Sequence, residues 1–600
     1  MPAQHSHDMP YGAQIEDGGV RFRIWAPAQD TLNLILGSAE GEQALPMAPV
    51  DDGWFALTTD AATAGGRYCY QLANDLRVPD PASRFQPEDV HGPSQIIDPR
   101  AYEWRQTDWR GRPWREAILY ETHVGAFTAP GDYDSLRRKL DYLADIGITA
   151  VELMPLSDFE GRRNWGYDGV LPFAPDSSYG APDALKQLID AAHERGLMMF
   201  LDVVYNHFGP SGNYLALYAP GFFTDHFHTP WGDAIDFTRH EVRQFFIHNV
   251  LYWLEEYRFD GLRFDAVDQI RDPSETHFLT ELAQTVRARI TNRHVHLVLE
   301  NDDNAAHYLG RDRLAQPALF TAQWNDDFHH AAHVIATAED SGYYVDYMDE
   351  PTAALGRALT EGFIYQGERS EYRNRNRGEP SAQLPSGAFV DFIQNHDQIG
   401  NRAFGERLNA LADAEAVEAL TAILLLAPQV PLLFMGEEWG APQPFYYFCD
   451  YEGELADAVR EGRRQEFSRF AEFAHPEARE RIPDPNAEAT FVTSCIDWLA
   501  SERLAGQRRL EFVSKLLDIR RREIVPRLDA TDGHYEIQRR ALRVEWTLAD
   551  GARLYLAANL SPKAVDRLDW TLPGSTLFVH PRKATSTALP PWAVVWACAS

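Results

Sequence analysis

The chain has 600 residues and a mass of 68.0 kDa, enough for several domains. Its composition, 44% hydrophobic and 24% charged, is that of a folded globular protein and excludes a collagen-like, coiled-coil or largely disordered chain. There are 56 Lys and Arg against 89 Asp and Glu residues, a net charge of −33. That balance disfavours nucleic acid and anionic membranes as partners, because phosphate binding depends on basic side chains.

Cysteine usage and hydropathy indicate a cytoplasmic protein. Cys69, Cys449, Cys495 and Cys598 lie far apart and form no CxxC pair, so neither a zinc cluster nor a disulfide framework is predicted. The N-terminus shows no basic segment followed by an apolar one, so no secretory signal is expected. The longest apolar stretch, 421–435, contains two prolines and is too short to span a bilayer. The oligomeric state stays open, with a monomer as the default.

Short alternating segments at both ends of the chain predict β-sandwiches. Residues 20–25 alternate apolar and polar side chains, and Asp17-Gly18-Gly19 provides a turn signal before them. A Pro-rich stretch at 79–99 is a plausible linker. After about residue 535 the strand pattern returns, at 541–546, 553–558, 577–580 and 592–596.

The long middle part of the chain alternates apolar runs with helical patterns. Eight runs are expected to be strands: 118–121, 149–153, 198–204, 261–265, 295–300, 318–320 (the weakest), 388–393 and 430–434. Helices are expected between them, for example at 135–146, 182–195 and 241–257. Apolar strands separated by helices indicate a parallel sheet covered on its faces, and eight such units predict a (β/α)8 TIM barrel. A doubly wound open sheet is the alternative, but no glycine-rich phosphate loop follows the first strand.

Polar side chains end several of these runs, at the edge where (β/α)8 enzymes carry their active sites. Three are carboxylates from different strands: Asp265, Glu300 and Asp397. Converging carboxylates indicate either a metal site or acid–base chemistry on an acetal. Glycoside hydrolysis needs two carboxyl groups with opposed tasks.

The neighbours of Asp265 and Glu300 predict different protonation states. Arg263 shares a face with Asp265, because residues two apart on a strand point the same way, and its charge favours the carboxylate. Glu300 follows an apolar run, which raises a carboxyl pKa and retains the proton. We therefore expect an ionised nucleophile and a proton donor. Three further side chains are expected to contact sugar hydroxyls: His207, His396 and Asp397.

Asp202 and a group of histidines have simpler interpretations. Asp202 ends the third run and is expected mainly to pair with Arg263 and fix its position. His329, His330 and His333 have the i, i+4 spacing of a helical metal pair, but no glutamate lies between them as in a zinc protease. We expect surface or substrate-loop histidines.

The chain resembles the alpha-amylase family of glycoside hydrolases in four ordered regions. These are Asp202-Val-Val-Tyr-Asn-His207, Gly261-Leu-Arg-Phe-Asp265, Glu300 and Asn395-His396-Asp397. The resemblance implies a retaining mechanism through a glycosyl-enzyme ester, with Asp265 as nucleophile, Glu300 as general acid/base and Asp397 as transition-state stabiliser. It also implies that Arg263, His207 and His396 serve the sugar in subsite −1, and that Tyr167 of Trp165-Gly-Tyr-Asp-Gly169 stacks on it.

The same resemblance implies the domain organisation. A carbohydrate-binding-like β-sandwich is expected at 1–98, the barrel at 99–530 with a small subdomain at about 207–237, and a C-terminal β-sandwich at 531–600. Many amylases use the residue matching Asn206 as a calcium ligand, but no further convincing ligand set is visible, so no metal and no cofactor are expected. Asn301 stands where an acid is expected directly after Glu300, which puts the local hydrogen bonding of Glu300 in question.

Longer strings narrow the resemblance to members that act on trehalose-capped malto-oligosaccharides. They are Glu121-Thr-His-Val-Gly-Ala-Phe-Thr128, Tyr205-Asn-His-Phe-Gly-Pro-Ser-Gly-Asn-Tyr214, Trp324-Asn-Asp-Asp-Phe-His-His330 and Gln394-Asn-His-Asp-Gln-Ile-Gly-Asn-Arg402. The implied substrate is a malto-oligosyltrehalose or a related α-glucan. Loop residues expected near the + subsites are Trp231, Asp233, Asp326, Asp327 and His329. A glycogen branching or debranching enzyme is the alternative within the family, and a non-catalytic glycan-binding protein is the alternative outside it.

Overall fold

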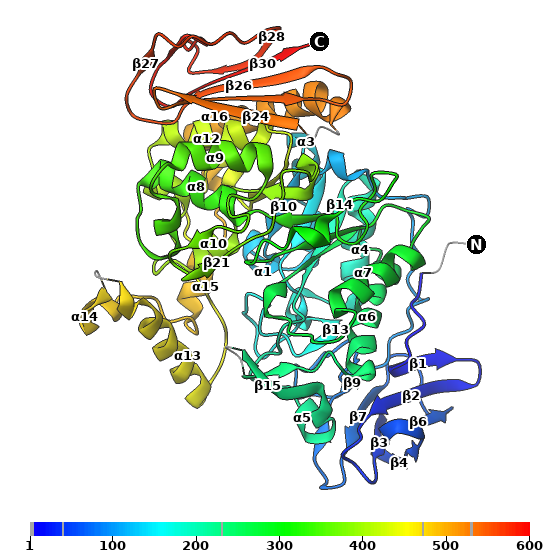
Figure 1. Cartoon of the computed structure of the whole chain (residues 1–600). Helices are drawn as coiled ribbons and strands as arrows, with labels where there is room; N and C mark the ends of the chain where they lie inside the picture. The colour runs from blue at the N-terminus through cyan, green and yellow to red at the C-terminus, as the bar shows by residue number, and fades with distance from the viewer. Residues whose placement is uncertain (1–4, 39–40, 230–231, 471–472, 529–531) are drawn as a thin grey trace.

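The computed structural model describes residues 5–38, 41–229, 232–470, 473–528 and 532–600. Three parts follow one another along the molecule (Figure 1): a β-rich N-terminal part, a central barrel and a β-rich C-terminal part. No helix in the described ranges is long and apolar enough to cross a membrane.

The N-terminal part is the predicted β-sandwich. One sheet has the strand order β1 (Gly12–Glu16), β2 (Gly19–Trp25), β6 (Trp54–Thr59) and β5 (Ala48–Pro49). The other has β4 (Gly41–Pro46), β3 (Asn33–Ser38), β7 (Arg67–Gln71) and β8 (Arg77–Val78), with β9 (Ser94–Gln95) also paired to β7. On β2 the side chains of Val20, Phe22 and Ile24 are buried and alternate with partly exposed ones, as the period of two predicts.

The middle of the chain forms a closed barrel of eight parallel strands, which confirms the predicted fold. In order they are β10 (Leu119–Thr122), β11 (Ala150–Leu153), β14 (Met198–Val203), β17 (Gly261–Phe264), β18 (His296–Leu299), β19 (Ala322–Trp324), β22 (Phe389–Asp391) and β23 (Val430–Phe434). Seven coincide with predicted runs.

The sixth strand was predicted at 318–320 but lies at Ala322–Trp324, so that prediction is wrong by four residues. The apolar triplet 318–320 pairs with the loop before it instead. The backbone N–H groups of Ala318 and Phe320 donate to the carbonyls of Gly310 and Tyr308.

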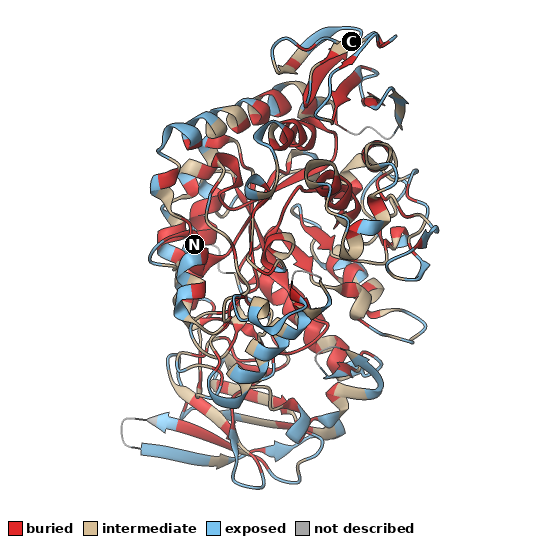
Figure 2. Cartoon of the chain, turned by 90° about the vertical axis from the view of Figure 1, so that its left-hand side faces the viewer, coloured by how far each residue is buried: buried red, intermediate tan, exposed pale blue. Residues whose placement is uncertain are grey.

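Helices cover the outside of the barrel. Their bounds are α2 (Tyr133–Arg137), α3 (Leu140–Ile146), α4 (Pro182–Glu194), α6 (His240–Glu255), α7 (Phe278–Arg289), α8 (Asp326–Thr337), α9 (Pro351–Glu361), α12 (Ala414–Leu426) and α16 (Leu504–Ile519). The single helix predicted at 135–146 is in fact α2 and α3, with Arg138 and Lys139 between them. The outer helix faces are exposed and the strands behind them buried (Figure 2).

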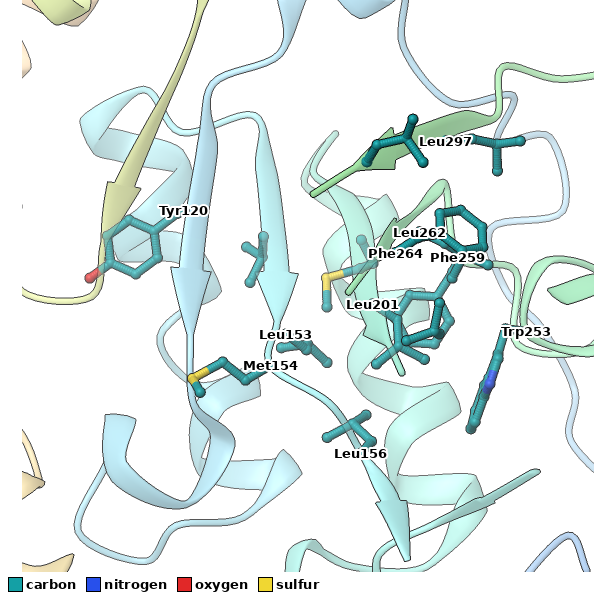
Figure 3. Packing of buried hydrophobic residues seen from close by; sticks show 14 of the residues in the cluster. Tyr120, Leu153, Met154, Leu156, Leu201, Trp253, Phe259, Leu262, Phe264 and Leu297 are labelled. Carbon is teal, nitrogen blue, oxygen red and sulfur yellow. The ribbon is translucent and has the colours of Figure 1, made fainter. Parts of the chain in front are cut away.

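Strand alternation divides the barrel core into two clusters. Side chains such as Leu119, Met198 and Phe200 pack inside the barrel. The intervening strand residues point outward to the helices and belong to a second cluster. Figure 3 labels some residues of that cluster: Tyr120, Leu153, Met154, Leu156, Leu201, Trp253, Phe259, Leu262, Phe264 and Leu297. Because neighbours on a strand face opposite ways, the strand register also decides which polar residues face inward at the strand ends.

Two excursions leave the barrel. The segment expected at about 207–237 contains α5 (Leu215–Tyr218) and a hairpin of β15 (Phe223–Thr229) and β16 (Gly232–Ile235). A second excursion, missed by the sequence analysis, contains α13 (Gly453–Glu466), α14 (Pro476–Arg479) and α15 (Glu488–Ser494). In Figure 1, α13 and α14 project away from the barrel.

The C-terminal part packs its main sheet against barrel helices. That sheet has the order β24 (Asp532–Gln538), β25 (Ala541–Thr547), β26 (Arg553–Asn559), β30 (Ala593–Ala599) and β28 (Ser575–His580), and β27 (Val565–Asp566) pairs with β29 (Ala588–Leu589). The Trp546 indole N–H donates to the Leu359 carbonyl of α9 at 2.9 Å. A separate apolar cluster, which includes Leu568 and Trp570, covers the sheet's other face.

Gly261 is a position where the barrel core tolerates no side chain. A Cβ there would lie 2.1 Å from the Phe200 ring and 2.7 Å from the His296 carbonyl. Overpacking of a rigid core costs about 1–3 kcal/mol, so Gly261→Ala should lower the apparent melting temperature, measured by scanning calorimetry. Gly462→Ala on α13 is the matched control, because nothing lies within 4 Å of its added Cβ and alanine favours a helix. A wild-type melting temperature for Gly261→Ala would contradict this packing.

Candidate active site

The inward positions at the ends of three strands, β14, β17 and β18, form a polar layer above the apolar barrel interior. On β14 the inward residues are Met198 and Phe200, so the next inward residue is Asp202. Asp202 pairs in register with Arg263 on β17. Asp265 and Glu300 come directly after β17 and β18. Elements far apart in sequence thus bring one cation and three carboxyl groups together.

Arg263 contacts all three of those carboxyl groups. Its Nη1 donates to Asp202 Oδ2 at 2.6 Å and to Asp265 Oδ1 at 2.8 Å, and its Nη2 lies 2.7 Å from Glu300 Oε2. The guanidinium is only 1% exposed and lies 4.3 Å from the centre of the Trp324 ring. The expected pairing of Arg263 with Asp202 and Asp265 is present. The contact of Arg263 with Glu300 was not expected from the sequence.

Burial raises the pKa of two of these carboxyl groups. The pKa of Glu300 is well above its usual value because burial and the charges of Asp265 and Asp397 outweigh the attraction of Arg263. Burial also raises the pKa of Asp202 to about 7, against the opposing effect of Arg263. Glu300 Oε2 accepts the Ala266 backbone N–H at 2.8 Å. The direction of this shift favours the protonated form of Glu300, the form in which a carboxyl group can donate a proton.

Asn206 and His207 brace Asp265 from the third strand. The Asn206 amide donates to Asp265 Oδ2 at 2.8 Å, and its carbonyl oxygen accepts from His207 Nδ1. His207 Nε2 lies 2.9 Å from the Tyr167 carbonyl oxygen. The Asn206 side chain is therefore engaged with Asp265, and no group of three or more potential metal-ligating side chains is found in the described ranges.

His396 and Asp397 lie together at the start of α10 (His396–Gly400). The Tyr167 ring stacks on the His396 ring at 5.1 Å between centroids, and the Tyr167 hydroxyl donates to Asp202 at 2.6 Å. Asp397 Oδ1 accepts from the Asn401 amide at 2.7 Å, and burial raises the Asp397 pKa. Tyr167, His396 and Asp397 thus connect to Asp202 and the Arg263 cluster.

Two of the residues expected in substrate loops lie instead in a buried helix. Asp327 and His329 belong to α8, and both are buried. Asp327 pairs with Arg377, and His329 Nδ1 lies 2.9 Å from the Ile393 carbonyl oxygen. Both residues lie in a buried helix and not in loops, so their expected position in substrate loops is wrong. Their polar atoms are bonded to partners within the protein.

The remaining loop residues have different outcomes. Asp233 is exposed on β16 and lies 3.1 Å from the His228 ring. Asp326, at the start of α8, is partly exposed, and burial raises its pKa to about 7. Trp231 lies outside the described residues. His330 and His333 are buried on α8 rather than on a surface loop, so that expectation is also wrong.

Asn301 has no hydrogen bond to Glu300. Its side chain accepts the Asp303 backbone N–H at 3.0 Å, and Asp302 pairs with Arg373. Glu300 takes its hydrogen bonds from Ala266 and Arg263. The asparagine at position 301 therefore takes no part in the hydrogen bonding of the Glu300 side chain.

Two cavities share Phe208 in their linings. The larger, about 830 Å³, is lined by His207, the β15–β16 hairpin and Arg271. The second, about 710 Å³, is lined by Asp168, Asn401 and the α13 helix. Both are within the size range of ligand-binding clefts.

Three further residues face the polar layer, and no function was expected for them from the sequence: Glu121, Glu152 and Trp324. Glu121 pairs with His396, and Glu152 lies beside it in register on β11. Their position two residues after an inward apolar residue on the same strand was the signal that could have found them.

Comparison with known proteins identifies the relatives of this chain. The model of the family described as alpha amylase, catalytic domain, matches residues 86–217. Carbohydrate-binding module 48 (isoamylase N-terminal domain) matches 10–81, and a domain of unknown function, DUF3459, matches 530–596. A malto-oligosyltrehalose trehalohydrolase of Deinococcus radiodurans is 40% identical over 88% of this chain and 87% of its own length. The chain belongs to the malto-oligosyltrehalose trehalohydrolase family.

A second trehalohydrolase, of Saccharolobus solfataricus, is 38% identical over 86% of this chain and 87% of its own length. A crystal structure of an alpha-amylase-type protein from Salmonella typhimurium has a TM-score of 0.94 and 46% identity, covering 98% of this chain and all of that one. The similarity to known proteins thus extends over the barrel and both β-rich parts.

Arg263→Lys should disable this trehalohydrolase-family site, because one ammonium group cannot bridge three carboxyl groups. Loss of two charge-assisted hydrogen bonds, about 3 kcal/mol together, corresponds to roughly a hundredfold lower kcat/KM. Steady-state hydrolysis of a malto-oligosaccharide measures this loss. Arg520→Lys is the control, because Arg520 is equally buried but donates to backbone carbonyls away from the site. Near-wild-type kinetics for Arg263→Lys would refute the bridging role.

Proposed function

We propose that the protein is a retaining glycoside hydrolase that cleaves the α-1,4 bond next to the terminal trehalose of malto-oligosyltrehalose. The products are trehalose and a malto-oligosaccharide, as in trehalose biosynthesis. The observation that carries the proposal is the contact of one guanidinium with both Asp265 and Glu300, at 2.8 and 2.7 Å. A shared cation supports the close spacing of carboxyl groups that retention requires. The names of the relatives supply the substrate.

The reaction has two displacements. Asp265 attacks the anomeric carbon and forms a glycosyl ester, while the proton of Glu300 passes to the departing glycosidic oxygen and releases trehalose. The Glu300 carboxylate then takes a proton from a water molecule, whose oxygen attacks the anomeric carbon and frees Asp265. Asp397 accepts from sugar hydroxyls in the transition state, and Tyr167 stacks on the ring.

The + side of the cleft is assigned to the region of the β15–β16 hairpin. The cavity of about 830 Å³ beside His207 has room for a disaccharide and includes Asp233 in its lining. Asp326 is the second proposed trehalose contact, since it is partly exposed and interacts with Asp397. The contact of Trp231 with trehalose is proposed from the sequence alone.

No cofactor is needed for this chemistry, and a monomer would suffice because the described residues supply both carboxyl groups. We propose a cytoplasmic location. All four cysteines are free, and a reducing compartment keeps them so.

Product analysis on maltotriosyltrehalose tests the function. The wild-type protein should release trehalose and maltotriose, and Asp265→Ala should lose at least 10⁴-fold in turnover while keeping its circular dichroism spectrum, an effect of about 5 kcal/mol on the barrier. Incubation with maltoheptaose separates the alternative. If maltoheptaose gains new α-1,6 branch points and maltotriosyltrehalose releases no trehalose, the protein is a branching enzyme and the proposal is refuted.

The pH dependence of kcat/KM should report Glu300. Because its pKa is raised, the protonated acid persists above the usual carboxyl range, and activity is lost as the pH rises through that pKa. Glu300→Gln should remove this alkaline limb. The variant Glu300→Gln should also keep a far larger part of the wild-type rate of the first displacement with α-maltosyl fluoride than with the oligosaccharide. The reason is that fluoride needs little protonation to leave. A wild-type profile that keeps rising well above neutral pH would be inconsistent with a protonated Glu300.

A further inference from the structure

Both carboxylate oxygens of Glu121 bind one residue of the sugar site. Glu121 follows the inward residue Leu119 by two positions on β10, so it points into the barrel, and it is 1% exposed. Its Oε2 accepts the His396 backbone N–H at 2.9 Å, and its Oε1 accepts from the ring nitrogen Nδ1 of His396. The buried carboxyl group is thus committed to a single partner.

The ring of His396 is held on its remaining sides by aromatic groups. Tyr167 stacks on it at 5.1 Å with an interplanar angle of 19°, and Trp165 meets it edge-on at 5.4 Å. With Nδ1 bonded to Glu121, Nε2 is the ring nitrogen available to a sugar hydroxyl. The backbone bond fixes the first N–H of α10, the helix that also carries Asp397.

We propose that Glu121 is a positioning residue for the glycosyl site: it orients His396 so that Nε2 presents an N–H donor to the sugar, and it fixes the start of the helix that carries Asp397. This inference rests on the proposed function, because it concerns the sugar bound beside Asp265. A carboxylate on Nδ1 stabilises the imidazolium, in which both ring nitrogens donate.

The charges around His396 agree with that geometry. Burial lowers an imidazole pKa, but Glu121 and Asp397 outweigh it, and the pKa of His396 is raised. Arg263 on β17 acts in the opposite direction on this pKa, and His396 in turn lowers the pKa of His123, which follows β10. Burial holds the pKa of Glu152 on β11, which interacts with Glu121, well above its usual value. Burial thus favours the neutral form of Glu152, and Glu121 is the carboxyl group in direct contact with His396.

The substitution Glu121→Gln tests the proposal, because glutamine keeps the size and loses the charge. Without the counter-ion the pKa of His396 falls, so the imidazolium is lost at lower pH than in the wild type. We expect kcat/KM to fall roughly 10- to 100-fold at pH 8, the effect of one hydrogen bond to a charged group, and less at pH 5 to 6. The optimum of kcat/KM should move to lower pH.

Two comparisons separate positioning from a general loss of structure. Glu438→Gln is the matched control: Glu438 is an equally buried glutamate outside the polar layer, and its carboxyl oxygens accept from the hydroxyls of Tyr120 and Tyr142. Its pH profile should stay within about twofold of the wild type, less than a 0.5 kcal/mol effect. In a His396→Gln background, Glu121→Gln should add little further loss, because it acts through the missing ring.

An equal loss at every pH, or a full additional loss in the His396→Gln background, would overturn the proposal. If Glu121→Gln does not fold, Glu121→Asp replaces it, because aspartate keeps the charge with a shorter reach. Glu121→Asp should lower kcat without moving the pH optimum of kcat/KM to lower pH. A move of the optimum to lower pH in this variant would count against the role of Glu121. If the wild type cleaves α-glucans but releases no trehalose, the proposed function fails. The same comparison on the cleaved glucan then still decides the role of Glu121.

Discussion

The active-site layer depends on a single buried cation. Arg263 is almost fully enclosed, lies over Trp324 and contacts Asp202, Asp265 and Glu300. A buried charge is costly unless it is paired, and one guanidinium cannot neutralise three carboxylates in a medium of low dielectric constant. Burial, together with the charges of the neighbouring carboxyl groups, raises the pKa values of Asp202 and Glu300 against the opposing effect of Arg263. The protonated forms favoured here therefore follow from burial and charge balance at the barrel mouth.

Much of this arrangement could be predicted because it depends on local patterns. Alternation along β14 and β17 places Asp202 and Arg263 on the inward face, and their pairing was expected from position alone. The barrel itself follows from eight apolar runs separated by helices. The opposed environments of Asp265 and Glu300 follow from a neighbouring arginine and a preceding apolar run.

Other features depend on contacts that no local pattern reports. Glu121 and His396 are 275 residues apart, and only closure of the barrel brings them together. The sixth strand was misplaced because residues 318–320 are apolar enough for a strand but pair with their own loop. Asp327 and His329 were misassigned because polar residues usually indicate an exposed surface, whereas the partners Arg377 and Ile393 permit their burial.

The backbone is strained at Ala266, where the segment that carries Asp265 meets Glu300. Ala266, directly after Asp265, has φ of +40° and ψ of 51°, a left-handed conformation that is unfavourable for a residue with a Cβ. This turn directs the Ala266 N–H to Glu300 Oε2, and the next N–H, of Val267, donates to the Glu300 carbonyl at 3.0 Å. Two consecutive backbone donors thus fix Glu300 to the segment that carries Asp265. A strained residue persists only where its surroundings hold it in place, and here the strained turn couples the positions of Asp265 and Glu300.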